Sequence, residues 1–289
     1  MNYEKYLEII NCKINFKLLE GENDIYNLND ILEYVCANAE KIMDKSKNED
    51  SGIYEYLISK YMEEIWVSEL MPPYKIGKET EEFSFSIIEN NKIDENSRLS
   101  KVERSELMNL FESIKYLFGK DFKSPRNDKL NVELIMKVHK ILMVDLLQEE
   151  QRGAFRKKLV RPSNSTLDSY CLPKKIESRL ITLIKYINDK LSVCDNVINA
   201  LKIGTLFFSE FLLIHPFVDG NGRCARLLIN YILKDYLLIP FSLYYKNRDL
   251  YINVLESRNN YMEPPNELAG YILQCVRKTL NTAEFLLMD

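Results

Sequence analysis

The organisation of this chain is best understood from residues 215–226, which read H-P-F-V-D-G-N-G-R-C-A-R. A mostly apolar run over residues 203–214 precedes them, and Pro216 disfavours the α region for His215, so we expect a buried helix to end there. The Asp, Asn and glycine residues that follow favour a tight turn. Apolar residues then recur at helical spacing, at Leu227, Leu228, Tyr231 and Ile232. The stretch therefore predicts two helices joined by a short loop, with the second helix beginning near Asn221.

The polar residues of this stretch suit a phosphorylated ligand. The start of a helix presents unpaired N–H groups and the positive end of the helix dipole, which attract anions. Arg223 and Arg226 lie in the first turn, where cations oppose the dipole by ~0.3–1 kcal/mol each, so we expect an anion to compensate them. Asp219 can offer an oxygen to a magnesium ion carried by phosphates, and His215 has the pKa range of a base for a hydroxyl group.

The same residue types also have ordinary structural uses. A turn that reads D-G-N-G can join any two helices, a His before Pro can cap a helix, and two arginines can form a solvated face. The convergence of base, carboxylate, anion-binding loop and arginine pair within one turn favours the functional interpretation.

Residues 215–226 match H-x-F-x-D/E-G-N-G-R-x-x-R at every fixed position, and the chain thereby resembles the Fic-domain family (filamentation induced by cyclic AMP). The resemblance extends over about residues 81–287. It implies an all-α fold, a Fic helical bundle with a small β-hairpin flap. It also implies a reaction, which is the transfer of AMP from ATP to a side-chain hydroxyl of a protein with release of pyrophosphate.

The resemblance assigns a role to each signature residue. His215 would be the general base, Phe217 would anchor the loop to the core, and Asp219 would bind magnesium. The phosphate-binding residues that it implies are Gly220, Asn221, Gly222, Arg223 and Arg226. Positioning and charge stabilisation of this kind supply most of the catalysis in phosphoryl-type transfer.

A second stretch, Ser84–Asn91, reads S-F-S-I-I-E-N-N and resembles the end of an autoinhibitory helix found in many Fic proteins, S/T-x-x-x-E-G/N. The resemblance implies that Glu89 pairs with Arg226 and blocks productive seating of ATP. The match is imperfect, because Phe85 stands where Ser or Thr is usual. An exposed Glu beside a turn is the alternative.

A third stretch resembles the family's target-binding flap, at Leu159–Leu172, after G-A-F-R at residues 153–156. Apolar arms around a polar tip predict a hairpin, and the resemblance implies that its edge pairs with the backbone of the target protein. A surface loop is the alternative. The flap residues assigned to target binding are Val160, Arg161, Tyr170 and Cys171, and the resemblance adds Tyr251 and Asn259 on the adenine side.

The remainder of the chain predicts further helices. We expect a helical N-terminal extension at residues 1–80, as scaffold or partner surface with scaffold favoured, and a Fic domain at residues 81–289. Ser100 and Glu103 form a capping box, Asn131 is a helix N-cap, and His139 is expected to be structural.

The composition of the chain limits the classes of protein to which it can belong. The formal net charge of −4 gives no general attraction to nucleic acid or acidic membranes. We expect no signal peptide and no apolar run of membrane-spanning length, and six scattered cysteines without a Cys-x-x-Cys pair indicate reduced thiols. Two histidines exclude a His-rich zinc site. The expected location is cytoplasmic, and a homodimer is possible.

The functional alternatives stay open. Autoinhibited AMP transfer to a Ser, Thr or Tyr hydroxyl of a protein is the leading hypothesis. The same site could instead remove AMP, with Glu89 orienting water, or transfer another nucleotide moiety. A non-catalytic nucleotide-binding module is the alternative from a different class.

Overall fold

The computed structural model describes residues 14–18, 27–46, 56–62, 99–119, 127–161, 170–237, 240–243, 248–257 and 263–286. Within these ranges the chain is helical and no strand is formed, which confirms the predicted all-α class. The α-helices are α2 (Leu28–Ser46), α5 (Lys101–Phe118), α6 (Val132–Leu142), α7 (Ile176–Leu191), α8 (Val197–Ile214), α9 (Asn221–Ile232), α10 (Arg248–Glu256) and α11 (Asn266–Leu286). The short helices η1 (Glu149–Gln151) and η2 (Pro173–Lys175) are of the 3-10 type, and residues 56–62 are also helical.

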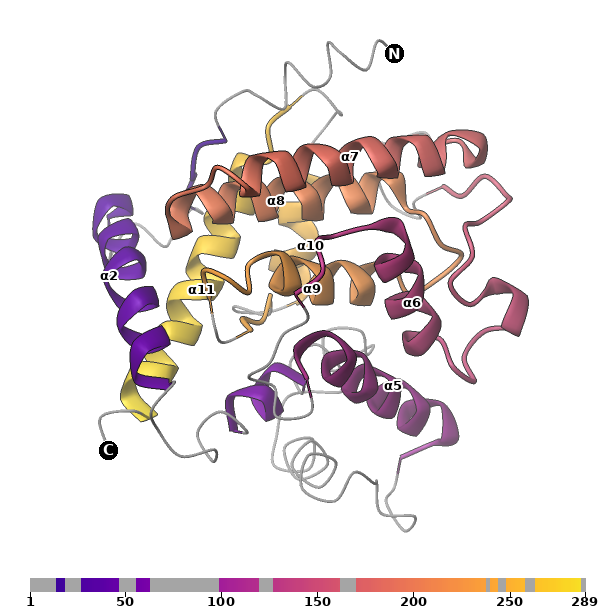
Figure 1. Cartoon of the computed structure of the whole chain (residues 1–289), viewed down its shortest axis with the longest axis horizontal. Coiled ribbons are helices and arrows are strands. Elements are labelled where there is room, and N and C mark those ends of the chain that lie inside the picture. The colour runs from indigo at the N-terminus through magenta and orange to yellow at the C-terminus, as the bar shows by residue number, and fades with distance from the viewer. Residues whose placement is uncertain are drawn as a thin grey trace.

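Helix α8 is the centre of the fold, and α7, α9, α11 and α2 pack against it (Figure 1). Its aromatic residues Phe207, Phe208 and Phe211 are fully buried. Burying a side chain of this size contributes about 1.5–3 kcal/mol, so the position of α8 is strongly determined. The ends of α8 and α9 that face the signature loop are therefore held by the core.

By length and composition, α8 is apolar enough to cross a membrane. The expectation that no apolar run approaches this length is therefore wrong. The physical reason is its position, since 72% of its 18 residues are buried inside the fold and a central core helix needs apolar residues on every side.

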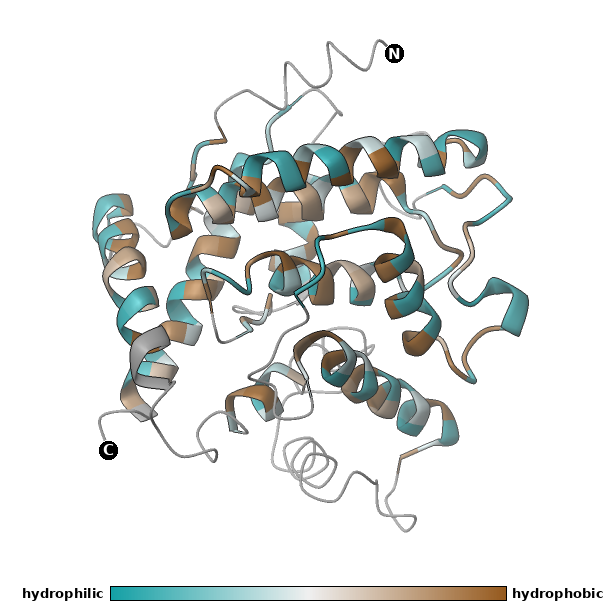
Figure 2. Cartoon of the chain, viewed as in Figure 1, coloured by the Kyte–Doolittle hydropathy of each residue, from teal (hydrophilic) through white to brown (hydrophobic). Residues whose placement is uncertain are grey.

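Helix α5 has its apolar residues on one face, and Leu107, Leu110, Ile114 and Leu117 are buried. Figure 2 shows hydrophilic and hydrophobic residues alternating along it, as expected for a helix with one exposed side. The capping box of Ser100 and Glu103 and the N-cap of Asn131 are both formed, as predicted. Helices α5 and α6 pack on each other and on α9, which places both beside the start of α9.

The described part of the N-terminal region shares the core of the rest of the chain. Residues 14–18 run beside the start of α11, where the N–H of Lys17 donates to the carbonyl of Asn266 at 3.2 Å. A Cβ at Gly270 would clash with the carbonyl oxygen of Lys17, so this close approach needs a glycine. Tyr61 donates to the carbonyl of Arg226 at 3.2 Å. These contacts favour a scaffolding role for the N-terminal residues.

Several predicted features lie outside the described residues. They are the proposed inhibitory segment 84–91 with Glu89, the tip of the flap at 162–169, the domain boundary near residue 80, and Asn259. The two arms of the flap are described, and the N–H of Tyr170 donates to the carbonyl of Val160 at 3.1 Å. This bond joins the arms, although no strand is assigned to them. The described cysteines are free thiols, namely Cys36, Cys171, Cys194, Cys224 and Cys275.

Candidate active site

His215 ends α8, as predicted, and takes a left-handed conformation with φ 49° and ψ 62°. Its N–H donates to the carbonyl of Phe211 at 2.9 Å. In the side chain, Nδ1 lies 3.3 Å from the carbonyl oxygen of Leu212, and the ring stacks on Tyr170 with centroids 3.9 Å apart. A carbonyl oxygen can only accept, so Nδ1 carries the proton and Nε2 carries the lone pair.

Burial lowers the pKa of His215 to about 4. The positive charge of Arg156 lowers this pKa further, while the Leu212 carbonyl and Asp219 partly oppose the shift. The imidazole is therefore neutral near pH 7, and its Nε2 can accept a proton from a hydroxyl group.

The loop after His215 is held in shape by hydrogen bonds between its own residues. Phe217 is fully buried, and the amide of Asn221 binds its backbone twice, accepting from its N–H at 3.0 Å and donating to its carbonyl at 3.0 Å. Both the oxygen and the nitrogen of the Asn221 side chain are thus bonded inside the loop. Only its backbone N–H can contribute to the predicted phosphate cradle. Gly220 has φ 75°, and a Cβ there would lie 2.5 Å from Cε of Met143, so this position requires glycine.

The start of α9 presents the N–H groups needed for an anion. The N–H of Cys224 bonds the carbonyl of Gly220 at 3.0 Å, which makes it the first N–H in the helix ladder. The N–H groups of Asn221, Gly222 and Arg223 precede it and have no carbonyl one turn earlier in the helix. Asp219 Oδ1 accepts from the N–H of Gly220 at 2.6 Å, which fixes the carboxylate at the mouth of the loop.

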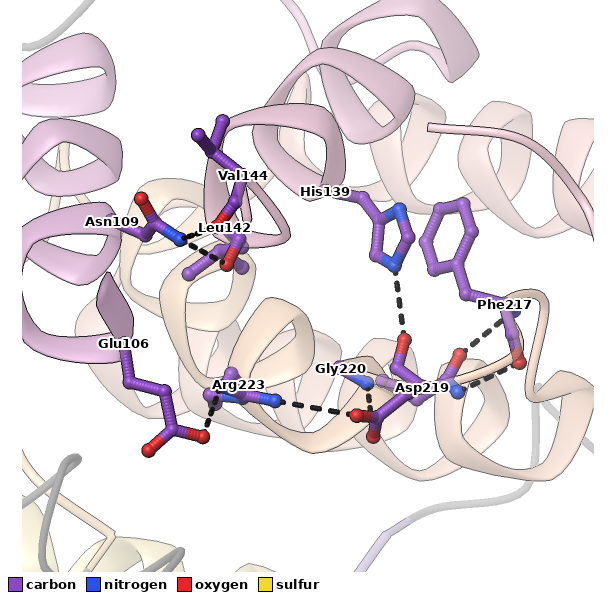
Figure 3. A network of polar contacts seen from close by, with 10 residues as sticks. Glu106, Asn109, His139, Leu142, Val144, Phe217, Asp219, Gly220 and Arg223 are labelled. Atoms are coloured by element: carbon purple, nitrogen blue, oxygen red, sulfur yellow. Dashed lines mark hydrogen bonds and ion pairs between the residues drawn. The ribbon is translucent and has the colours of Figure 1, made fainter. Parts of the chain in front are cut away.

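Arg223 is buried between two carboxylates (Figure 3). Its Nη1 donates to Oε1 of Glu106 at 3.1 Å, and its Nη2 lies 3.6 Å from Oδ2 of Asp219. Burial raises the pKa of Glu106, and the nearby guanidinium opposes this shift. The Nε atom of Arg223 is buried with no hydrogen-bond partner among the described residues. One N–H of the guanidinium is thus left for a ligand.

Arg226 points to a different element. Its Nη1 donates to the hydroxyl of Tyr251 on α10 at 3.4 Å, and its guanidinium lies over the same ring, 5.9 Å from the centroid. Tyr251 is buried. It can therefore orient Arg226, whereas its ring is not open to an adenine base in this structure. The two signature arginines share one helix face, yet α5 supports one and α10 the other.

His139, which the sequence predicts to be structural, contacts the signature loop. Its Nδ1 accepts from the N–H of Gly153 at 2.8 Å, so its Nε2 is protonated and donates to the carbonyl of Asp219 at 2.9 Å (Figure 3). Its ring also stacks on Phe217, 3.7 Å between centroids. The expected structural role is confirmed, and it consists of fixing the signature loop. Burial lowers the pKa of His139 to about 4, which keeps the ring neutral.

Arg156 is a second contributor whose role the sequence did not reveal. It is buried, and its guanidinium donates to the carbonyls of His215 (2.6 Å), Lys158 (2.8 Å), Cys171 (2.5 Å) and Ile214 (3.3 Å). It therefore ties both arms of the flap to the end of α8. Neither Glu106 nor Arg156 carries a local signal for these roles, because Glu106 binds Arg223, 117 residues later, and Arg156 binds the carbonyl of His215, 59 residues later.

The remaining flap residues differ in exposure. Arg161 is exposed, Val160 and Tyr170 are half-buried, and Cys171 is buried. The side chain of Cys171 does not reach the surface, its carbonyl accepts from Arg156, and its N–H donates to the carbonyl of Leu213, so this residue serves the attachment of the flap rather than direct contact with a target.

The donor set fits a hydrated magnesium ion. The side chain of Asp219 is 65% exposed and points to the start of α9. No group of three or more acidic, His or Cys side chains that could hold a metal is found in the described part of the chain. Magnesium is commonly held by one or two carboxylates together with water and phosphate oxygens, so a single carboxylate beside an anion site is adequate.

A cavity of about 470 Å³ lies beside His215 and Tyr170. Helix α10 contributes Ile252, Leu255 and Glu256 to its wall, and residues 263–268 also line it. Its volume lies within the range of small-molecule sites, and its lining mixes apolar and polar side chains.

Residues 129–233 match the model of the Fic/DOC family. The chain is similar to protein adenylyltransferase Fic of Nematostella vectensis, 24% identical over 182 residues that cover 63% of this chain and 40% of that protein. It is also similar to protein adenylyltransferase Fic of Drosophila mojavensis, 33% identical over 86 residues, which cover 30% of this chain and 17% of that protein. The chain thus spans less than half the length of these two relatives.

Solved structures share the fold. Fic-1 (residues 134–508) from C. elegans has a TM-score of 0.64 at 16% identity, covering 90% of this chain and 73% of that one. A Fic-domain-containing signaling protein from Bacteroides thetaiotaomicron has a TM-score of 0.61 at 16% identity, covering 86% and 98%. At this identity the likeness shows the fold alone.

Proposed function

We propose that this chain, whose residues 129–233 match the model of the Fic/DOC family, is a protein adenylyltransferase. It transfers AMP from ATP to a Ser, Thr or Tyr hydroxyl of a target protein. The names of the similar proteins from Nematostella vectensis and Drosophila mojavensis support this activity.

One observation carries the proposal. The neutral imidazole of His215 and the buried guanidinium of Arg223 flank one short loop whose end is an anion-binding helix start. A base for a hydroxyl and a cationic cradle for phosphates are the two parts that AMP transfer needs.

The reaction follows from this arrangement. The triphosphate lies at the start of α9, where the first N–H groups and Arg223 offset its charge. The hydroxyl oxygen of the target bonds to the α-phosphorus as the bond from that phosphorus to the bridging oxygen breaks. Nε2 of His215 takes the hydroxyl proton, and pyrophosphate leaves with the electron pair. Arg226, oriented by Tyr251, holds the terminal phosphate.

Magnesium would be held by Asp219 and phosphate oxygens. When bound, it offsets the negative charge of the phosphates. His139 supports this function by fixing the backbone of Asp219, so that the carboxylate stays at the mouth of the loop.

We propose that the nucleoside occupies the cavity of about 470 Å³, and the support for this is that His215 lines the cavity and also begins the signature loop. Apolar atoms of Ile252 and Leu255 can contact the base, and Glu256 or Ser257 can contact the ribose hydroxyls.

Labelled ATP tests the function. With ATP labelled at the α-phosphate, we expect transfer of label to protein, and mass spectrometry should show the added mass of AMP on a hydroxyl side chain. His215→Ala should abolish the transfer. The exposed Lys185→Ala variant on α7 serves as the control. Binding of ATP without transfer in any preparation, including Glu89→Gly, would show a nucleotide-binding module instead.

A further inference from the structure

The flap arms, defined as residues 157–161 and 170–175, carry a charge that the transfer reaction does not require. Their exposed cations are Lys157, Lys158, Arg161, Lys174 and Lys175. The arms contain no acidic residue, and Asp168 in the tip is the only one between residues 157 and 175. The whole chain has a net charge of −4, so the flap is locally opposite in sign to the protein that carries it.

The arms are joined to each other and to the catalytic His215. Arg156 donates to the carbonyls of Lys158 and Cys171, and to that of His215, from one buried guanidinium. The bond from Tyr170 to Val160 closes the same unit. A partner that binds the arms is therefore placed next to the imidazole.

The five cations lie at the exposed surface of the arms. None of the five forms an ion pair with any described part of the chain. Two large apolar side chains lie among them, with Leu159 47% exposed and Leu172 44% exposed. A purely solvated lysine face needs no exposed leucines, whereas a docking surface uses apolar contacts bordered by charge.

We propose that the flap arms bind an acidic segment of the protein target, with aliphatic residues among the acids, beside the hydroxyl that receives AMP. This inference rests on the proposed transfer reaction. The charge of the arms selects acidic partners and increases their rate of association. The net negative charge of the whole chain disfavours nucleic acid and anionic membranes, which would face most of the surface at once.

Peptide binding tests the proposal. Three labelled peptides share one Thr and two Leu residues and differ at the other positions, which are Glu, Gln or Lys. Fluorescence anisotropy with the full chain at low salt should show the Glu peptide binding at least about tenfold more tightly than the Gln peptide, and the difference should shrink as salt is added.

Charge reversal identifies the surface. Lys174→Glu/Lys175→Glu should remove the preference for the Glu peptide, while Lys101→Glu/Lys185→Glu, with the same change in net charge on α5 and α7, should keep it. An oligo-dT of equal charge and phosphatidylserine vesicles serve as competing polyanions. Equal binding of the Glu and Gln peptides, or tighter binding of either polyanion than of the Glu peptide, overturns the proposal.

The labelled-ATP experiment separates the two claims. Transfer of AMP without any preference for the Glu peptide removes this inference and leaves the function. Selective binding of the Glu peptide without any AMP transfer removes the function and leaves an acidic docking surface.

Discussion

Nη1 of Arg223 donates to Oε1 of Glu106 at 3.1 Å, and this bond links α5 to the first turn of α9. Asp219 lies on the other side of the same guanidinium at 3.6 Å. Arg223 is thereby balanced between two carboxylates, one on the loop and one on a helix more than a hundred residues earlier. Because Glu106 also binds the guanidinium, Asp219 is not its only carboxylate partner.

Glu106→Ala should therefore lower kcat/KM for ATP by roughly tenfold, which corresponds to about 1.4 kcal/mol of lost positioning. Without Glu106, Arg223 turns toward Asp219, and the concentration of magnesium needed for half-maximal activity rises. Glu106→Gln, which keeps an acceptor at the same place, should recover part of the loss. Glu112→Ala, also on α5 but exposed, is the matched control. An increase in activity in Glu106→Ala would show that this carboxylate competes with the phosphates instead.

The pH dependence of stability should report on His139. Its pKa is about 4 in the fold, against 6.5 for the ordinary group, so the unfolded chain binds more protons between these values. Its contribution is fully present well above pH 6.5 and is lost as pH falls toward 4, by about 2 kcal/mol between pH 7.5 and 5. Urea unfolding at pH 7.5 and 5.0 measures it. His139→Gln should show a smaller pH dependence than the wild type, because His215 then remains the only histidine; identical dependence in the two proteins would contradict the assignment.

Leu255→Trp should fill the cavity beside His215 and raise KM for ATP about tenfold or more, since the nucleoside loses its place. Asn253→Trp adds the same bulk at an exposed position two residues away on α10 and should leave KM unchanged. Steady-state kinetics on both variants decides the location of the nucleoside. An unchanged KM in both would place it elsewhere.

Glu89→Gly should increase self-modification several-fold if Glu89 occupies Arg226 in the resting protein, because removing the carboxylate frees the guanidinium for a phosphate. Labelled ATP on the purified variant measures this. Glu177→Gly, at an exposed position of α7, controls for a general effect of glycine. Equal labelling in the wild type and Glu89→Gly would remove the autoinhibition hypothesis.

Local sequence determined the elements of the site. Pro216 and Gly220 set where α8 ends and α9 begins, because the steric limits of proline and glycine act within a few residues. The caps at Ser100 and Asn131 were predictable for the same reason, since their hydrogen bonds reach only three residues ahead. The order of charges after His215 also predicted an anion at the helix start.

Only the tertiary structure decided what surrounds those elements. Glu106 binds Arg223 because α5 packs beside α9. Arg156 donates to the carbonyl of His215 at the end of α8 because the flap arms fold back onto that end of the helix. Such contacts depend on helix packing across long separations, which leaves no pattern in the local sequence. The membrane-like composition of α8 likewise found its explanation in burial at the centre of the bundle. The chemistry of the loop is thus encoded in twelve neighbouring residues, while its geometry is set by side chains that the packed core brings to it.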